Sequence, residues 1–304
     1  MLLHLATLGG ATHRSAVKTW RARRALYADY VGIFAVDGGH VVGQTYVKRI
    51  EYTFPEGTET VSAIASVGTR PDRARAGIAR RVLEEVHSRE REAGIRFATL
   101  WTNRSWGAHR LYERLGYRDV YAFPWATRGP RAAAAGSHRS KVIGPARTSE
   151  LGALEELHRV ESNGRVGFVR RPKGYLRTAA AVRAFDPAHD LLVARRGTRP
   201  VGYAVVQSSG TQAVCGEIVA KSVPVREALI SEIERRHSGA VIAFQHTLVS
   251  DAEQRFRQLG YTILKAGWYT FMASSLGRPW SHSRAVRAFA ARSHRFLCLS
   301  GDRF

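Results

Sequence analysis

Two blocks of this sequence occur twice in the same order, and this internal repeat restricts the fold more than any other feature. Ala35 and Gly43 match Ala194 and Gly202 at an offset of 159 residues, and a later block repeats at an offset of 144. Matched blocks in one order indicate a duplicated domain, because each repeat is one structural unit. The smaller second offset predicts a deletion of 15 residues in the second copy. The paired blocks are residues 34–43 with 193–202 and residues 108–117 with 252–261.

The apolar spacing in the first copy alternates between strand and helix patterns. Ile78, Val82 and Val86 recur every four residues, as on one face of a helix, and Gly116 is a typical helix stop. We therefore expect two tandem domains of the α+β or α/β class, each a mixed, mainly antiparallel sheet flanked by helices. The expected helices are 14–28, 77–92 and 105–115, and the expected strands are 31–36, 40–49, 60–69, 97–102 and 117–123.

A segment rich in alanine, glycine and basic residues separates the two copies and is typical of a linker. The C-terminal segment contains six basic residues and one acidic residue, and we expect a helix at 281–296. We expect this tail to pack on its own domain; the alternative is that it binds RNA, a membrane surface or a partner. The predicted boundaries are 1–128 for the first domain, 129–143 for the linker, 144–276 for the second domain and 277–304 for the tail.

Residues 67–79 leave an expected strand, turn through proline and small residues, and enter an expected helix. Backbone N–H groups at a helix N-terminus bind anions, and the helix dipole favours negative charge there. Gly77 has no side chain to block a bulky anion. The pattern indicates a diphosphate site, and an ordinary loop with solvated arginines is the alternative. The surrounding arginines are Arg70, Arg73, Arg75, Arg80 and Arg81.

Together with a second motif, this loop resembles the GNAT family of acyl-CoA-dependent N-acetyltransferases. The family's loop reads Q/R-x-x-G-x-G/A, and residues 77–79 match its end. Ala74 stands where the family has glutamine or arginine, so Arg73 or Arg75 is the expected substitute. The resemblance covers residues 1–125 and implies a tandem form with an intact first copy and a degenerate second copy. The second motif, A-x-x-L-Y followed by G-F/Y, is matched by Ala108, Leu111, Tyr112, Gly116 and Tyr117.

The resemblance implies an N-acetyltransferase that uses acetyl-CoA as its co-substrate and acetylates a primary amine. It implies that Tyr112 protonates the CoA sulfur, and that a backbone N–H in the strand at 67–69 holds the thioester oxygen. The alternative for Tyr112 is a core aromatic side chain. The general base is open among Glu51, Glu56 and Glu59. The implied cofactor-binding residues are Val67, Gly68, Thr69, Arg73, Arg75, Ala76, Gly77, Ile78, Ala79 and Asn103.

The second copy lacks the residues that carry this chemistry. Its expected strand at 215–221 is followed by Ser222, Val223 and Pro224, without a glycine or a turn of small residues. Phe256 stands in the position of Tyr112, and Thr247 stands in that of Asn103. We therefore expect a GNAT-like fold without catalysis, which covers the substrate cleft or extends the contact between domains.

The net charge of +22 raises nucleic acid as a partner. Arginines far outnumber lysines and the excess is spread along the chain, which favours the codon bias of a GC-rich genome as its source. We therefore expect an amine-bearing small molecule or a protein amine as the acceptor, and do not favour nucleic acid. The alternative functions are an RNA-modifying GNAT protein and a non-catalytic protein that senses acyl-CoA.

Cysteine use and hydropathy address location and metals. The two cysteines have no CxxC spacing, which fits a reducing cytoplasm. The histidines show no metal-ligand spacing, so no metal is expected. No stretch approaches 18 apolar residues, and no membrane span is expected.

Overall fold

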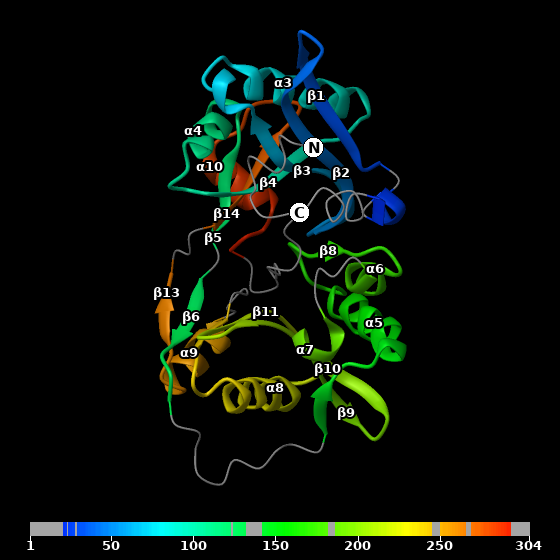
Figure 1. The fold of residues 1–304 in the computed structure, drawn as a ribbon, viewed down its shortest axis with the longest axis vertical. Coiled ribbons are helices and arrows are strands. Elements are labelled where there is room, and N and C mark those ends of the chain that lie inside the picture. The colour runs from blue at the N-terminus through cyan, green and yellow to red at the C-terminus, as the bar shows by residue number, and fades with distance from the viewer. Residues whose placement is uncertain are drawn as a thin grey trace. The chain divides into compact units, whose positions relative to one another are not determined.

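The computed structural model describes residues 21–22, 24–27, 29–122, 124–131, 142–181, 186–244, 250–265 and 269–292. The chain divides into two compact units (Figure 1). Within the described residues, the first unit contains 21–122 and 269–291, and the second contains 124–265 and 292. No helix in this described part is long and apolar enough to cross a membrane. Most of the predicted linker, at 132–141, lies outside the described residues.

The first unit is a mixed, mainly antiparallel sheet with helices, as predicted. Its strands follow the order β1-β2-β3-β4-β14-β5, and along this path only β3 and β4 pair in parallel. Gly38 and Gly39 both have positive φ in the tight turn between β1 and β2. The strands are β1 (Val31–Asp37), β2 (His40–Phe54), β3 (Gly57–Thr69), β4 (Phe97–Asn103), β5 (Arg118–Ala122) and β14 (Tyr269–Ser275). The helices are η1 (Pro71–Arg73), α3 (Ile78–Glu92), α4 (Gly107–Arg114) and α10 (His282–Ala288).

The second unit repeats this architecture. Its sheet has the order β13-β6-β12-β11-β10-β9-β7, in which only β11 and β12 pair in parallel. The strands are β6 (Trp125–Arg128), β7 (Ile143–Pro145), β8 (Val169–Arg170), β9 (Leu191–Arg196), β10 (Arg199–Ser209), β11 (Gln212–Ala220), β12 (Val241–Phe244) and β13 (Thr262–Leu264). The helices are η2 (Thr148–Glu150), α5 (Leu151–Glu161), α6 (Tyr175–Ala181), α7 (Pro187–Asp190), α8 (Val223–Arg236) and α9 (Ser250–Gln258).

The first repeated block has the same structural role in both units, which confirms the predicted duplication. Ala35 pairs with Gly43 across β1 and β2, and Ala194 pairs with Gly202 across β9 and β10. A Cβ atom on Gly43 would lie 2.4 Å from Cγ2 of Ile78, and one on Gly202 would lie 2.7 Å from Cγ1 of Val225. Both glycines therefore let the first turn of a helix, α3 or α8, approach the sheet closely.

The second repeated block also folds alike in both units. Gly116 and Gly260 end α4 and α9 with φ values of 90° and 79°. The following Tyr117 donates its backbone N–H to the carbonyl of Tyr112 at 3.0 Å, and Tyr261 donates to that of Phe256 at 2.9 Å. These are the helix stops that the Leu-Gly-Tyr sequences predict.

The residues missing from the second copy come from the hairpin and the turn that follows it. Strands β10 and β11 are shorter than β2 and β3. Eight residues, 70–77, connect β3 to α3, whereas two residues, 221–222, connect β11 to α8. The deletion therefore removes most of the turn that we predicted to bind a diphosphate.

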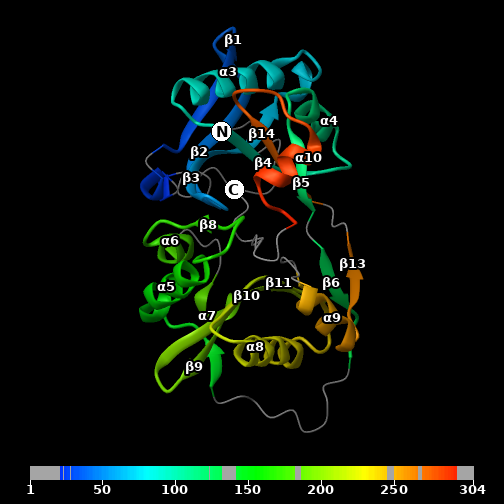
Figure 2. The same ribbon diagram turned by 180° about the vertical axis from the view of Figure 1, so that it is seen from behind.

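The two units exchange one strand each. Strand β14 lies between β4 and β5 in the first sheet, and β6 lies between β12 and β13 in the second. In Figure 1 the orange and red of β14 and α10 lie among the blue and green elements of the first unit, and Figure 2 shows green β6 beside orange β13. The predicted boundaries place 125–128 in the first domain and 269–276 in the second. In the structure these segments belong to the opposite units: 125–128 to the second and 269–276 to the first. Strand-forming segments do not specify their neighbour in a sheet, and the repeat made each strand compatible with either unit.

The exchanged strands are held by polar contacts as well as by the sheet. Thr270 of β14 donates its hydroxyl to Asp119 of β5 at 3.0 Å. Arg128 of β6 pairs with Glu234 of α8 at 2.8 Å, and its guanidinium lies 4.7 Å from the ring centre of Tyr261. Both contacts are at least partly buried, so they contribute more than exposed pairs would.

The C-terminal segment packs on the first unit rather than on the second domain, where we expected it. Helix α10 ends at Ala288, earlier than the predicted 281–296, and residues 293–304 lie outside the described part. Phe289 is fully buried, with ring centres 5.1–6.1 Å from those of five other aromatic side chains. These are Tyr52, Phe54, Phe97, Phe271 and Trp280. This aromatic cluster fixes the tail to the sheet of the first unit.

Phe256 is a test of the core of the second unit. Its side chain is 1% exposed, and its ring centre lies 4.8 Å from that of Phe244. Phe256→Ala is expected to lower the free energy of unfolding by about 3–5 kcal/mol, because the cavity it leaves cannot fully collapse. Chemical denaturation followed by circular dichroism measures this change, with Arg257→Ala on the same helix as the exposed control. A variant as stable as the wild type would show that Phe256 is not part of the core.

Candidate functional site

The sheet of the first unit opens where β3 and β4 end. These two strands pair only from Ser62 with Ala98 to Ile64 with Leu100, whereas β4 pairs with β14 along all seven residues. The remainder of β3, from residue 65 to 69, and the end of β4 thus diverge from each other. The backbone N–H and C=O groups that face the gap are not paired with the neighbouring strand, so they can form hydrogen bonds with a ligand.

A β-bulge lies in the diverging part of β3. The pairing of β2 with β3 shifts between Gln44 and Tyr46, and Ser66 has a φ of 54°, which is unusual for a residue other than glycine. The side-chain amide of Gln44 donates to the carbonyl of Ser66 at 3.4 Å, and the hydroxyl of Thr45 donates to that of Ala65 at 3.1 Å. The sequence did not point to Gln44 or Thr45; a polar pair within an apolar strand was the available signal.

Two buried polar atoms near the bulge have no hydrogen-bond partner among the described residues. They are Oγ1 of Thr69, at the end of β3, and Oε1 of Gln44 on β2. Such atoms are uncommon in folded proteins and are often satisfied by a ligand or a water molecule. The polar groups near the end of β3 are therefore not all hydrogen-bonded within the described part of the protein.

The turn from β3 into α3 combines two residues of positive φ with a helix N-terminus that no side chain caps. Arg75 and Gly77 adopt positive φ values of 63° and 75°, and Gly77 is the N-cap of α3. No side chain caps this helix, so the backbone N–H groups of its first turn have no side-chain acceptor. Strain at a non-glycine residue such as Arg75 is commonly found at functional loops. Ala76, Ile78 and Ala79 complete the turn, with Ile78 buried against Val42 and Val82.

The arginines around this turn differ in their partners. Arg70 forms two hydrogen bonds with Asp72, at 2.6 and 2.7 Å, and Arg73 pairs with Asp37 at 3.1 Å. Arg80 pairs with Glu84 at 2.7 Å. Within the described residues Arg75 has no carboxylate partner. Between the two expected substitutes for the family's glutamine or arginine, the structure therefore favours Arg75 over Arg73.

Tyr112 lies on the inner face of α4 and packs in an apolar cluster with Ile64 and Leu100, the last paired residues before the strands diverge. Burial raises the pKa of its phenol to about 12. The hydroxyl is therefore protonated throughout the neutral and mildly alkaline range. Among the described residues it has no hydrogen-bond partner, whereas Nε2 of His87 lies 2.8 Å from the hydroxyl of Tyr117.

Asn103 ends β4 and turns the chain into α4. Its Oδ1 accepts hydrogen bonds from the backbone N–H of Ser105 at 2.9 Å and from the Ser105 hydroxyl at 2.7 Å. This side-chain turn sets the direction of the helix that carries Tyr112. Asn103 thus lies at the end of β4, beside the opening between β3 and β4. Its side-chain oxygen Oδ1 already accepts two hydrogen bonds within the protein.

The three candidate bases lie on the β2–β3 hairpin, near the end opposite the diverging strands. Glu51 pairs across the hairpin with Thr60, and Glu56 is exposed in its turn. Glu59 forms an ion pair with Arg96 at 3.0 Å. The bulge at Ser66 lies toward the other end of β3. This arrangement does not bring any of the three to Tyr112.

The second unit has a different chemistry at the corresponding positions. Phe256 occupies the position of Tyr112, and residues 221–222 replace the turn at 70–77. Thr247, the predicted counterpart of Asn103, lies outside the described residues. The second unit therefore keeps the fold and lacks both the loop and the phenol.

Comparison with known proteins agrees with this geometry. The acetyltransferase (GNAT) domain family matches residues 6–120. No curated protein matches the chain in sequence. A conserved protein from Enterococcus faecalis V583, described as a probable N-acyltransferase, superposes with a TM-score of 0.71 at 11% identity, covering 90% of this chain and 68% of that one.

Two further solved structures have the same architecture. A GCN5-related N-acetyltransferase from Kribbella flavida gives a TM-score of 0.66 at 15% identity, over 93% of this chain and 68% of that one. Eis1 from Mycobacterium abscessus gives 0.57 at 18% identity, over 86% and 70%. At these identities the similarity shows the fold alone, and it extends over both units. Residues 6–120 are therefore an acetyltransferase (GNAT) domain, and the chain as a whole has the fold of solved structures such as the GCN5-related N-acetyltransferase from Kribbella flavida, with two such folds in tandem.

Proposed function

We propose that the first unit transfers an acetyl group from acetyl-CoA to a primary amine of a small molecule or a protein. The observation that carries this proposal is the conjunction of three features near the C-terminal ends of the central strands β3 and β4. They are the diverging ends of β3 and β4, the uncapped N-terminus of α3 and the free phenol of Tyr112. The match of residues 6–120 to the GNAT domain family supports acyl transfer in general, and these features support acetyl-CoA as the donor.

The turn at 70–77 and the first turn of α3 would hold the diphosphate of CoA. Backbone N–H groups of residues 77–79 would supply hydrogen bonds, and the helix dipole would add partial positive charge. Arg75, with no carboxylate partner among the described residues, would add a full charge. The glycine at position 77 is required by its positive φ, which residues with a Cβ rarely adopt.

The diverging end of β3 would hold the acyl chain and the thioester. A backbone N–H in residues 67–69 would stabilise negative charge on the thioester oxygen. Oγ1 of Thr69, which has no hydrogen-bond partner among the described residues, would form a hydrogen bond with the bound CoA. Asn103 would position α4 at the opposite side of the opening. These residues orient the donor and exclude water, and they do not need to change protonation.

Tyr112 would supply the proton that the leaving CoA thiolate takes up. Its phenol is protonated because burial raises its pKa to about 12, and its hydroxyl has no competing partner among the described residues. The attacking amine loses a proton in the same reaction, and Glu51, Glu56 and Glu59 stay proposals for its acceptor, through water because they lie toward the hairpin turn. Cytoplasmic location and the absence of a metal also stay predictions.

Acetyl-CoA is expected to stabilise the first unit. At a free concentration a hundred times the dissociation constant, the added free energy of unfolding is about 2.7 kcal/mol. Thermal unfolding at increasing acetyl-CoA concentration measures it, together with release of free thiol in the presence of a panel of amines. Arg75→Ala is expected to weaken binding, whereas Arg89→Ala is the matched control, because Arg89 is ion-paired with Glu85 near the other end of α3.

Two results would contradict this proposal. An unchanged melting temperature across millimolar acetyl-CoA would exclude the binding site. Stabilisation without thiol release for any amine would instead indicate a protein that senses acyl-CoA and does not transfer the acyl group.

A further inference from the structure

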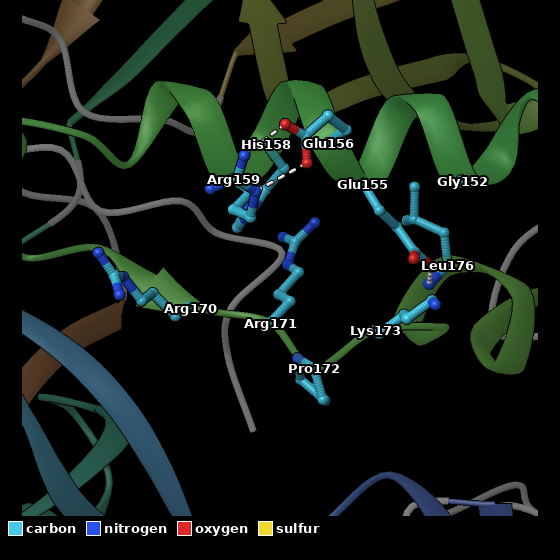
Figure 3. Close-up of a pocket in the computed structure, with 10 residues that line it drawn as sticks. All are labelled: Gly152, Glu155, Glu156, His158, Arg159, Arg170, Arg171, Pro172, Lys173 and Leu176. Atoms are coloured by element: carbon cyan, nitrogen blue, oxygen red, sulfur yellow. Dashed lines mark hydrogen bonds and ion pairs between the residues drawn. The ribbon is translucent and has the colours of Figure 1, made fainter.

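The second unit contains a cavity that lies apart from any counterpart of the acetyl-CoA site. It has a volume of about 300 Å³ and lies between α5 and the segment that runs from β8 into α6. Figure 3 shows the two walls, with Glu155, Glu156 and Arg159 on the helix and Arg170 to Lys173 on the facing segment. Such a volume is at the lower end of the range for small-molecule sites.

The acidic residues at this cavity are already used within the protein. Glu155 accepts hydrogen bonds from the backbone N–H groups of Gly174 and Leu176, both at 2.8 Å. Glu156 accepts two hydrogen bonds from the guanidinium of Arg159. Both carboxylates therefore have their hydrogen bonds satisfied, and Glu156 is also ion-paired, so a cationic ligand would have to displace an existing contact.

The most buried cation at the cavity is also satisfied. Arg171 donates to both carboxylate oxygens of Glu217, at 3.0 and 2.6 Å, and its side chain is 6% exposed. The hydroxyl of Tyr203 donates to the same carboxylate. The ion pair of Arg171 and Glu217 is part of the structure of the wall, because removing one residue would leave the charge of the other buried without a partner.

Two cations remain available to a ligand. Arg170 and Lys173 are exposed at the cavity, and no carboxylate pairs with either of them in the described part of the chain. They flank Arg171 on one segment, and Figure 3 shows their side chains on opposite sides of it, so each adds positive charge to a different part of this wall. After the internal pairs are accounted for, the free charge at the cavity is positive.

His158 adds an unmet hydrogen bond to this wall. The residue is 2% exposed, and its Nε2 has no hydrogen-bond partner among the described residues. Burial, and to a lesser extent the charge of Arg171, hold the pKa of the imidazole well below its usual value, so the ring is neutral. A neutral imidazole can donate or accept a hydrogen bond, according to its tautomer.

The rest of the lining is apolar or small. Leu176 and Pro172 border the cavity on the β8–α6 side, and Gly152 borders it on α5. A Cβ atom on Gly152 would meet no atom within 4 Å, so the space in front of it is open. The cavity thus combines an apolar surface with positive charge at its edge.

We propose that this cavity binds a small organic anion, with its carboxylate or phosphate group at Lys173 and its apolar body against Leu176 and Pro172, while Arg170 adds positive charge from the other side of Arg171. This would be a ligand site of the second unit, separate from acetyl transfer. It does not depend on the function proposed for the first unit, because every lining residue belongs to the second unit. The degenerate copy would then serve as a ligand-binding domain.

Isothermal titration calorimetry of the full-length protein at constant ionic strength tests this proposal by measuring the dissociation constant of each probe. The probes are benzoate and phenyl phosphate, with neutral benzamide as the uncharged counterpart. We expect one or both anions to bind and benzamide to bind at least tenfold more weakly, since a charged hydrogen bond is worth about a factor of ten or more. Preference for benzoate or phenyl phosphate identifies which anionic group the site takes.

Three variants locate the binding. The double variant Arg170→Ala, Lys173→Ala is expected to lower the affinity for the anion at least tenfold. Arg196→Ala with Arg199→Ala removes the same charge from the exposed β9–β10 hairpin and is expected to leave the affinity unchanged. Gly152→Leu is expected to block the cavity without lowering the melting temperature, because a side chain there enters open space and leucine favours a helix more than glycine.

Each opposite result overturns the proposal. Equal losses in the two double variants would mean that only net charge is sensed. Unchanged affinity in Gly152→Leu would place binding elsewhere, and benzamide that binds as well as benzoate would exclude anion recognition. No binding of either anion at millimolar concentration would exclude the site.

Discussion

A chain that ends at residue 267 is expected to lose the fold of the first unit, although it keeps every residue that matches the GNAT domain. The segment 268–291 supplies β14, which lies between β4 and β5 and pairs with both. Without it the two strands lose their shared partner, and their backbone groups become unpaired edges. The aromatic cluster around Phe289 also loses half of its members.

The size of this effect follows from the side chains that the segment buries. Each large apolar side chain contributes about 1.5–3 kcal/mol on burial. Five of them together are comparable to the whole stability of a domain, about 5–15 kcal/mol. The five are Phe271, Met272, Leu276, Trp280 and Phe289.

Circular dichroism and size-exclusion chromatography of residues 1–267 measure the loss. The control is the chain that ends at residue 292, which keeps β14 and α10 and is expected to fold like the full-length protein. Phe289→Ala gives a graded test in the intact chain, with an expected loss of about 3–5 kcal/mol. If residues 1–267 kept near-ultraviolet dichroism and acetyl-CoA-dependent stabilisation, the exchanged strand would not be needed for the fold.

Tyr112→Phe is expected to lower kcat by about 10²–10⁴-fold while acetyl-CoA affinity stays near that of the wild type. A positioned acid acts mainly in the transition state, and the substitution keeps the ring that packs in the core. The reduction will be at the lower end if the thiolate leaves before it is fully protonated. Because burial raises the pKa of Tyr112 to about 12, loss of the acid form should not limit the wild-type rate below that pH.

Tyr117→Phe is the matched control for this experiment. The two tyrosines contact each other at a ring distance of 5.9 Å, but the Tyr117 hydroxyl is buried and hydrogen-bonded to His87. Its removal is expected to lower the melting temperature and to leave kcat nearly unchanged. Turnover, acetyl-CoA affinity and thermal unfolding of both variants separate the roles. Normal turnover in Tyr112→Phe would assign that residue to the core alone.

Several features of this protein could be predicted from the sequence because they depend on neighbours along the chain. The four-residue spacing of Ile78, Val82 and Val86 predicts a helix at 77–92, and α3 spans Ile78–Glu92. The turn into α3 is predicted because only glycine readily takes the positive φ found at Gly77. The repeat predicts two similar domains, and Gly43 and Gly202 lie beneath equivalent helices. The GNAT fold and the tandem arrangement were within reach of the sequence for these reasons.

Other features depend on contacts between distant residues and were decided by the tertiary structure. Residues 125–128 form β6 and residues 269–275 form β14, and either sheet offers the same kind of gap between two strands. The choice is made by side chains such as Arg128 with Glu234 and Thr270 with Asp119, which are far apart in sequence. The partner of a strand is set by such long-range contacts and by burial, and local pattern carries no information about them.

The same distinction holds for the candidate site. Sequence alone indicates Gly77 and Tyr112, because a motif fixes their positions. The divergence of β3 and β4, the bulge at Ser66 and the contacts of Gln44 exist only once the sheet has formed. Local sequence determined which residues we propose to carry the chemistry, and the sheet decided where the strands diverge, because hydrogen bonds between strands depend on the whole register.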